Sequence, residues 1–170
     1  ELSGRPIGAN LEPVDDSVEM MSEKVEIAEG RKATAETFRA AEKLGLQFIC
    51  LTGNPGTGVT NKMIAKAIKV CKENFSGLII AGKMHAAGVD EPVVDIPTIK
   101  EFIEAGADVI LMPAPGTVPG ITMEYIRKLV CKAHSLGKMT LTAIGTSQEG
   151  ADIATIREIA LMCKMTGTDM

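Results

Sequence analysis

Short apolar runs alternate along the chain with longer segments whose apolar residues recur at helical spacing. The runs are nearly continuous, which is typical of parallel strands covered on both faces. They are Pro6–Leu11, Leu46–Leu51, Leu78–Ala81, Val109–Met112 and Met139–Ile144. Between them, apolar residues such as Met63, Ala67, Ile68 and Cys71 share one helical face. The first predicted helix runs from Ala33 to Leu44.

Glycines punctuate this alternation at a nearly constant interval. Gly45, Gly77, Gly106, Gly137 and Gly167 each precede a strand-like run, and subtraction gives spacings of 32, 29, 31 and 30 residues. Four of them directly follow a helical segment, the usual place of a glycine that ends a helix. A strand, a loop, a helix and a glycine in about 30 residues form a βαβ unit. Repetition of this unit predicts one α/β domain.

Two parallel architectures fit the repeat, a (β/α)8 TIM-type barrel and a five-stranded flavodoxin-like sheet. Even spacing without a long crossover favours the barrel. Five strands and the stub of a sixth at Thr168–Met170 are five to six of the eight that a barrel needs. We therefore expect residues 1–170 to be a single barrel domain, incomplete at both ends. The acidic stretch Val14–Arg31 is expected to carry a partial helix, Val18–Ala28, over the strand ends.

Composition narrows the classes of partner. The formal charge is −4, aromatic residues make up 3% and Trp is absent, so the sequence lacks the basic, aromatic surface of a nucleic-acid binder. No apolar run approaches the roughly 18 residues of a membrane span, and no signal peptide is recognisable. The four cysteines are scattered within apolar segments, which fits a reducing, cytoplasmic setting. A homo-oligomer is compatible with this composition.

Gly and Pro gather in the segments that follow the strands, whereas the turns before the strands are short. Ligands of parallel sheets bind at the carboxyl ends of the strands, so this asymmetry indicates an active face. Expected ligand contacts there are Asn10, Gly116, Thr117, Thr146, Ser147 and Gln148. Ser147 is not expected to be a nucleophile of the G-x-S-x-G type, because Glu149 stands where the second glycine belongs.

The turn Thr52–Gly58 joins the second strand to a helix. Val59 stands where a P-loop has its lysine, and Asn61 replaces the third glycine of a dinucleotide fingerprint. Backbone N–H groups of such a turn, with a helix N-terminus behind them, can still hold an anion. The residues expected to do so are Thr52, Gly53, Asn54, Gly56, Thr57 and Gly58. The alternative is a tight turn capped by Thr60 or Asn61.

Three residues are the candidates for catalysis: Glu12, Lys83 and His85. Lys83 and His85 are two apart after a strand, so they are expected to share a face, and the mouth is preferred because an unpaired lysine among helices is costly. Lys83 could hold an anion or act as a nucleophile, and His85 could transfer protons. Glu12 is the candidate base or Mg²⁺ ligand. His134 is expected to cap a helix C-terminus.

Several motifs resemble a known family: IGANLEP (7–13), FICLTGNPGTGVTN (48–61), LIIAGKMH (78–85), PGTVPG (115–120) and AIGTSQE (143–149). They are similar to a family of uncharacterised bacterial barrel proteins, often labelled haloacid-dehalogenase-like hydrolase or likened to phosphoenolpyruvate phosphonomutases. The second likeness implies Mg²⁺ and a small 2-oxo acid. The aspartates Asp90, Asp95, Asp108 and Asp152 form no D-x-D-x-T motif, so a dehalogenase mechanism is not expected.

The sequence is compatible with two classes of function. The first is an enzyme acting on a small phosphorylated or carboxylated metabolite at the mouth of the barrel, by lyase, mutase or isomerase chemistry or by hydrolysis. The second is a non-catalytic small-molecule-binding barrel that serves as a sensor or assembly factor. Turnover that depends on the three candidate residues would separate the two.

Overall fold

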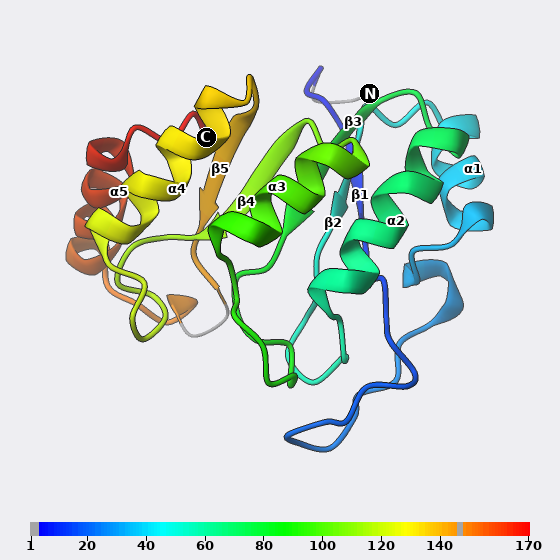
Figure 1. Ribbon diagram of the computed structural model, residues 1–170, viewed down its shortest axis with the longest axis horizontal. Coiled ribbons are helices and arrows are strands. Elements are labelled where there is room, and N and C mark those ends of the chain that lie inside the picture. Colours follow the sequence, from blue (N-terminus) through cyan, green and yellow to red (C-terminus); the bar gives the residue numbers. More distant parts are fainter. Residues whose placement is uncertain (1–3, 146–147) are drawn as a thin grey trace.

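Five parallel strands, each followed by a helix, make up the computed structural model, which describes residues 4–145 and 148–170 (Figure 1). The sheet order is β1-β2-β3-β4-β5, and every neighbouring pair is parallel. The elements are β1 (Gly8–Leu11), η1 (Glu29–Arg31), α1 (Ala35–Lys43), β2 (Phe48–Leu51), α2 (Asn61–Asn74), β3 (Leu78–Gly82), α3 (Ile96–Ala105), β4 (Val109–Pro113), α4 (Met123–Ser135), β5 (Met139–Ala143) and α5 (Ile153–Thr166). The predicted α/β class with a parallel sheet is confirmed.

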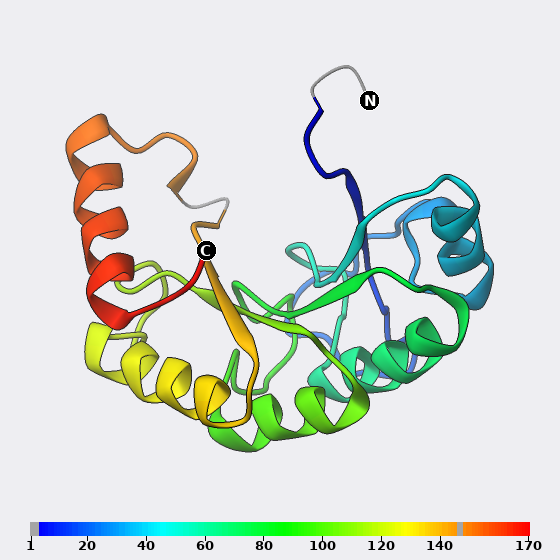
Figure 2. The same ribbon diagram turned by 90° about the horizontal axis from the view of Figure 1, so that it is seen from above.

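The strands curve into an arc, with the helices on its outer side (Figure 2). Alternate strand residues face those helices and form the main core, packed against side chains such as Ile68, Phe102 and Leu129. The helix-facing strand residues are Ile49, Leu51, Ile79, Ala81, Ile110 and Met112. On the other face, Cys50, Leu78 and Ile80 are partly or largely exposed, because no second layer of described residues covers the inside of the arc.

Local sequence explains where the helices begin and end. The helices α2 to α5 each begin after a Thr or Asp whose side chain accepts a hydrogen bond from the backbone N–H three residues on, at 2.7–3.2 Å. The residues that do this are Thr60, Asp95, Thr122 and Asp152. Four of the five repeat glycines have a positive φ just after a helix, as expected. Gly77 differs: a Cβ there would lie 2.5 Å from the carbonyl oxygen of Gln47, so close packing requires the glycine.

The acidic segment after β1 is not a helix, so the expected helix Val18–Ala28 is wrong. Residues 14–28, here called the strap, run in extended and bent conformations over the carboxyl ends of β1, β2 and β3 (Figure 1). The strap's backbone pairs with loops instead of with itself: Met21 N–H donates to Gly88 O at 2.9 Å, and Val25 N–H donates to Gly56 O at 2.8 Å. Only the turn η1 is helical in this region, and it is a 3₁₀ turn.

The last three residues lie along β5 but are not a regular strand. Met170 N–H donates to Thr140 O at 3.1 Å, and Thr142 N–H donates to Met170 O at 2.9 Å. These two bonds flank Leu141 in the pattern of a parallel ladder. The expected sixth-strand stub is therefore present as one parallel step. Among the described residues, no helix is both long and apolar enough to cross a membrane.

Candidate functional site

The loops that follow β1, β2 and β3 lie at one end of the sheet, where the strap covers them (Figure 1). Three hydrogen bonds tie this end together: Asp15 N–H to Gly58 O, Gly58 N–H to Ala87 O, and Met21 N–H to Gly88 O, at 2.9–3.0 Å. The backbone at Gly58 and Gly88 favours glycine, because their φ values are +73° and +83°. This end of the sheet, here called the mouth, contains all three predicted catalytic residues.

Glu12 continues β1 and is 1% exposed. Its Oε2 accepts from the backbone N–H of Asn54 at 2.9 Å, and its Oε1 accepts from the Asn54 side-chain amide at 2.9 Å. Arg31 forms an ion pair with the same Oε1. The buried carboxylate thus has a donor on each oxygen, and it orients Asn54 and Arg31 at the strand end. A metal ion at Glu12 would have to compete with these donors.

Arg31 is a mouth residue that the sequence analysis missed. Its backbone carbonyl accepts from Glu12 N–H at 2.8 Å, and its side chain is 53% exposed. Only one of its guanidinium nitrogens contacts Glu12 within the described part of the chain. A guanidinium held on one side by a buried carboxylate is oriented to bind an anion on the other. One feature of the sequence could have indicated Arg31: it stands at the end of the acidic segment, where the chain comes back to hydrogen-bond with Glu12 at the end of β1.

In the Gly-rich turn after β2, several backbone N–H groups already donate to acceptors within the protein. Asn54 N–H binds Glu12, Thr57 N–H donates to Asn54 O at 3.3 Å, and Gly58 N–H donates to Ala87 O. At the start of α2, Thr60 accepts from Met63 N–H, and the Glu91 carboxylate accepts from Asn61 N–H at 2.7 Å. The alternative of a tight, Thr60-capped turn is therefore realised. The anion at this helix N-terminus is Glu91.

Lys83 does not face the mouth as expected. It follows Ile79 and Ala81 on the helix-facing side and is 0% exposed, below the loops that lead to α2 and α3. The residue before it must be glycine, because a Cβ at Gly82 would lie 1.9 Å from Leu111 O. The ammonium is paired with Glu91 and lies 3.4 Å from Val59 O, so its cost of burial is offset. Burial lowers the pKa of Lys83, although the Glu91 carboxylate opposes this.

His85 lines a cavity of about 350 Å³ at the mouth. Other lining residues come from the strap, the Gly-rich turn and the loops after β3, β4 and β5; they include Ser22, Gly56, Met84, Val118 and Gly145. His85 Nδ1 accepts from the backbone N–H of Ala87 at 3.0 Å. Burial is the largest cause that lowers the pKa of His85; nearby Lys83 lowers it further, and Glu12 raises it. His85 is therefore held neutral, near both other candidates.

The remaining predicted contact residues have varied positions. Asn10 is exposed on β1. Thr52 is 2% exposed, and its hydroxyl has no hydrogen-bond partner among the described residues. Gly116 and Thr117 form a turn after β4, in which Gly116 N–H donates to Ile121 O at 2.9 Å. Gln148 accepts from Gly145 N–H at 3.0 Å, beside the cavity. The predicted contacts Thr146 and Ser147 lie outside the described residues.

The described residues contain no preformed cluster of three metal-ligating side chains. Nowhere in residues 4–145 and 148–170 do three His, Cys, Asp or Glu side chains gather closely enough to hold a metal ion. Glu12, the predicted ligand, already has donors on both oxygens, and Glu91 is paired with Lys83 and Asn61. A Mg²⁺ ion at the mouth would have to displace one of these partners. Thiols are poor ligands for Mg²⁺, which prefers oxygen, and burial raises the pKa of Cys50 to about 11 and that of Cys71 to about 12.

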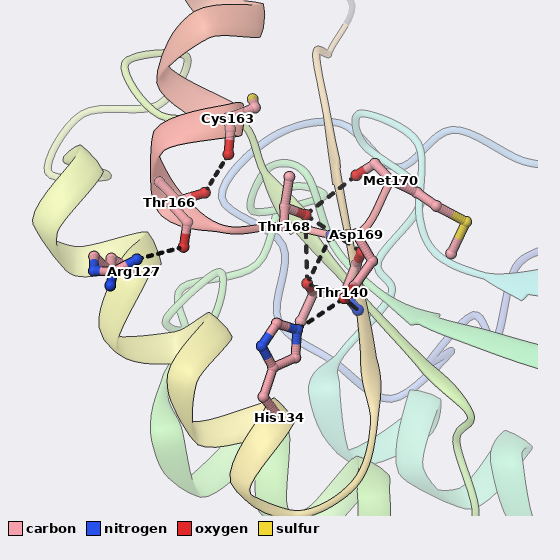
Figure 3. A network of polar contacts seen from close by, with 8 residues as sticks. All are labelled: Arg127, His134, Thr140, Cys163, Thr166, Thr168, Asp169 and Met170. Atoms are coloured by element: carbon pink, nitrogen blue, oxygen red, sulfur yellow. Dashed lines mark hydrogen bonds and ion pairs between the residues drawn. The ribbon is translucent and has the colours of Figure 1, made fainter.

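The opposite end of the sheet has a polar cluster of its own, here called the base cluster: His134, Thr140 and Asp169 (Figure 3). Asp169 Oδ2 accepts from the backbone N–H and the hydroxyl of Thr140 at 2.8 and 2.9 Å, and it lies 2.8 Å from His134 Nε2. The His134 bond is the largest cause that lowers the pKa of Asp169. Asp108 binds the backbone N–H of Ile79 in the same way at 3.0 Å, so these contacts are part of the repeat.

A larger cavity of about 570 Å³ lies between β5 and α5. Most of its lining is apolar, including Ile156, Ile159 and Cys163, and it lies along the β5 edge. It contains no histidine and none of the three candidate residues. The mouth cavity, although smaller, lies at the strand ends and is lined by one of the three candidate residues, His85, so we take it as the candidate site.

Comparisons with solved structures identify the barrel. The fold resembles oxaloacetate acetylhydrolase in complex with the product oxalate, with a TM-score of 0.63, 13% identity, and coverage of 97% of this chain and 57% of that chain. It resembles a putative lyase/mutase from Burkholderia cenocepacia J2315, with a TM-score of 0.55, 18% identity, and coverage of 96% and 59%. For 2,3-dimethylmalate lyase, a PEP mutase/isocitrate lyase superfamily member, the values are 0.50, 14%, 95% and 61%.

These likenesses establish the fold of a TIM-type barrel, of which the chain spans about three-fifths of the neighbours' length. At the level of the fold, these neighbours include a PEP mutase/isocitrate lyase superfamily member, whereas the haloacid-dehalogenase label is not supported. No curated protein matches the sequence. Over residues 1–170, the sequence matches the domain of unknown function DUF7916. The chain therefore belongs to the DUF7916 family.

Proposed function

We propose that the chain forms the site of a lyase- or mutase-like enzyme that acts on a small carboxylate metabolite, phosphorylated or not. The observation that carries the proposal is His85, held neutral by its surroundings and lining a cavity of about 350 Å³ at the carboxyl end of β3. That volume suits a small metabolite. The likeness of the fold to that of lyases and mutases supports the proposal by analogy.

The mouth residues suit this chemistry in distinct ways. His85 would contact the reacting part of the ligand and move or share a proton there. Arg31, oriented by Glu12, would hold a carboxylate or phosphate oxygen through its exposed N–H groups. Glu12 and Lys83 would act through the groups they hold, namely Arg31 and Asn54 for Glu12, and Glu91 for Lys83.

Turnover of a substrate panel tests the proposal. The panel contains 2-oxo acids, 2- and 3-hydroxy acids, and their phosphorylated counterparts. His85→Asn should lower turnover at least ~100-fold, the usual effect of losing a group that transfers a proton or donates to a developing oxyanion. Arg31→Gln should mainly raise KM. His134→Asn at the base is the matched control and should leave turnover unchanged. A substrate turned over equally well by the His85→Asn protein would overturn the assignment.

A second candidate, a non-catalytic binding barrel, is favoured by one observation. Glu12 and Lys83 are both buried and fully engaged with protein partners, as structural groups would be. This candidate predicts that a member of the panel raises the melting temperature without being consumed, and that His85→Asn preserves the effect.

The binding of Mg²⁺ can be tested separately from turnover. Because the described residues offer no three-ligand cluster, Mg²⁺ alone should not raise the melting temperature of the chain. A saturable rise that is lost in Glu12→Gln would show that Glu12 exchanges its present partners for a metal ion.

A further inference from the structure

We infer that the Ala87 N–H holds His85 as the Nε2–H tautomer, so that the ring presents a hydrogen-bond donor, not a base, to the ligand. The inference rests on the proposed function for its ligand: a carbonyl, carboxylate or enolate oxygen that can accept the bond. The geometry of the ring and its loop can be tested without any ligand.

The tautomer follows from the direction of one hydrogen bond. The backbone N–H of Ala87 is a donor only, and it lies 3.0 Å from His85 Nδ1, so this nitrogen carries no proton. A neutral ring then has its proton on Nε2. No described residue forms a hydrogen bond with Nε2, and His85 lines the mouth cavity. The donor is therefore available to a ligand.

Protonation to the imidazolium is opposed from two directions. A second proton would have to sit on Nδ1, directly against the Ala87 N–H. The charged groups around the ring are Lys83, which disfavours a second positive charge, and Glu12, which favours it. Each of these charges has its own partner, Arg31 for Glu12 and Glu91 for Lys83, and burial is the largest cause that lowers the pKa of His85. Burial and Lys83 outweigh Glu12, so the ring stays neutral.

Ala87 is the positioning residue in this arrangement. Its φ is +58°, and it is the one non-glycine residue with a positive φ among those described. The conformation is fixed on both sides: Ala87 O accepts from Gly58 N–H at 3.0 Å, and the side chain is packed so closely that a Cβ on Gly53 would lie 3.2 Å away. A residue in this strained region persists only where its surroundings hold it. Here those surroundings aim the N–H at His85.

A neutral donor in a buried cavity suits a particular reaction step. Charge that develops on a substrate oxygen, as in an enolate, is stabilised by a donor already in place. Because Nδ1 is engaged, His85 cannot remove the substrate proton through that nitrogen, and Nε2 carries its own proton. A base for such a step must come from another group.

Nitrogen-15 NMR of the uniformly labelled protein tests the tautomer directly. The chain has two histidines, so His134→Asn assigns both rings. At pH 7, His85 Nδ1 should resonate as an unprotonated nitrogen and Nε2 as a protonated one. A ¹⁵N–¹⁵N coupling should cross the hydrogen bond between the Ala87 amide and Nδ1. A proton on Nδ1, or a charged ring at pH 7, would overturn the inference.

Variants of Ala87 test the positioning role. Ala87→Val disfavours a positive φ and should remove the coupling and mix the tautomers, while His134 is unaffected. Ala87→Gly keeps both the N–H and the allowed φ, and should retain the coupling even if the valine variant does not fold. Loss of the coupling in Ala87→Gly, or its retention in a folded Ala87→Val, would reject Ala87 as the positioning residue. Titration with pyruvate should shift the His85 Nε2–H resonance. Failure of that arm alone would count against the proposed function and not against the tautomer.

Discussion

The mouth and the base of the sheet each place a histidine, a carboxylate and a threonine around strand ends, but the two sets differ in burial. At the base, the side chains of His134 and Asp169 are 41% and 31% exposed. Asp169 accepts from the backbone N–H of Thr140, just as Asp108, two βα units earlier, accepts from that of Ile79. At the mouth, Glu12 and Lys83 are almost completely buried, and each is bound to a different loop. The base contacts therefore fit a structural repeat, whereas the mouth residues break it. Polar groups buried where the repeat does not need them are typical of functional sites.

The largest expected contrast concerns the buried pair of Lys83 and Glu91. Glu91→Ala leaves a fully buried ammonium without its partner, which should lower the free energy of unfolding by about 3–5 kcal/mol. At the base, Asp169→Ala should cost about 1 kcal/mol, because its partners stay partly in water. Urea denaturation measures both. The double variant Lys83→Met with Glu91→Leu should recover most of the loss. If Glu91→Ala cost no more than Asp169→Ala, burial of the mouth pair would be unimportant for stability.

Glu12→Gln should have the next largest effect. The amide loses the charge that holds Arg31, and its NH₂ group meets a donor of Asn54, so we expect a loss of about 1–3 kcal/mol. Asp16→Asn is the control, because Asp16 pairs with Lys24 at 2.8 Å while its side chain is 86% exposed. That change should leave the free energy of unfolding almost unchanged, because solvent screens the exposed pair. Equal effects of the two substitutions would contradict a buried orienting role for Glu12.

The two histidines should differ in how stability depends on pH. The pKa of His85 is lowered in the folded state, so the unfolded chain takes up its proton first. Stability should therefore fall as the pH drops below about 6.5, and each unit of pKa difference corresponds to about 1.4 kcal/mol. His85→Asn should flatten this slope. A slope that disappears in His134→Asn instead would place the titrating group at the base.

Asp169 gives the base a separate signature at lower pH. Its pKa is lowered by the hydrogen bond to His134, so its stabilising contribution is present above about pH 4 and is lost as the pH falls further. Asp169→Asn should remove pH dependence in that acidic range only. Chemical denaturation at a series of pH values from 3 to 8, in buffers of constant ionic strength, would separate this range from that of His85.

The smallest effect should come from backbone strain in the loop after β3. Ala87→Gly relieves a positive φ and should be neutral or stabilising by up to about 1 kcal/mol. Its neighbour Ala86 has no positive φ, so Ala86→Gly should be destabilising by about 0.5–1 kcal/mol. Thermal unfolding of this matched pair measures the difference. A larger loss in Ala87→Gly than in Ala86→Gly would mean that Ala87 is not strained.

The comparison also shows what the sequence could predict. The strands, their parallel pairing and the helix-ending glycines follow from local patterns of apolar residues and glycine, which the repeat supplies several times. The strap could not be predicted in this way. Its residues 18–28 have helical spacing, but its backbone bonds go to Gly56 and Gly88, far along the chain. Long-range pairing of this kind leaves no periodic trace in the sequence.

For the side chains at the mouth, the sequence predicted the positions at the strand ends but not the hydrogen-bond partners. Glu12, Lys83 and His85 lie at the strand ends, as expected. The direction of the Lys83 side chain depends on where the alternation of faces in β3 begins. Its partner Glu91 lies in a loop whose path no local sequence pattern predicts. Arg31 was missed because only the fold brings it back to Glu12. The catalytic roles of the three residues stay predictions.

Chemical-shift mapping with a small 2-oxo acid tests the central claim most directly. Pyruvate is titrated into the ¹⁵N-labelled chain, and both histidine rings and all assigned amides are followed. The account predicts saturable shifts at His85, Arg31 and Asn54, with His134 and Thr140 unchanged. Shifts confined to the base cluster or to the groove between β5 and α5 would contradict a site at the mouth.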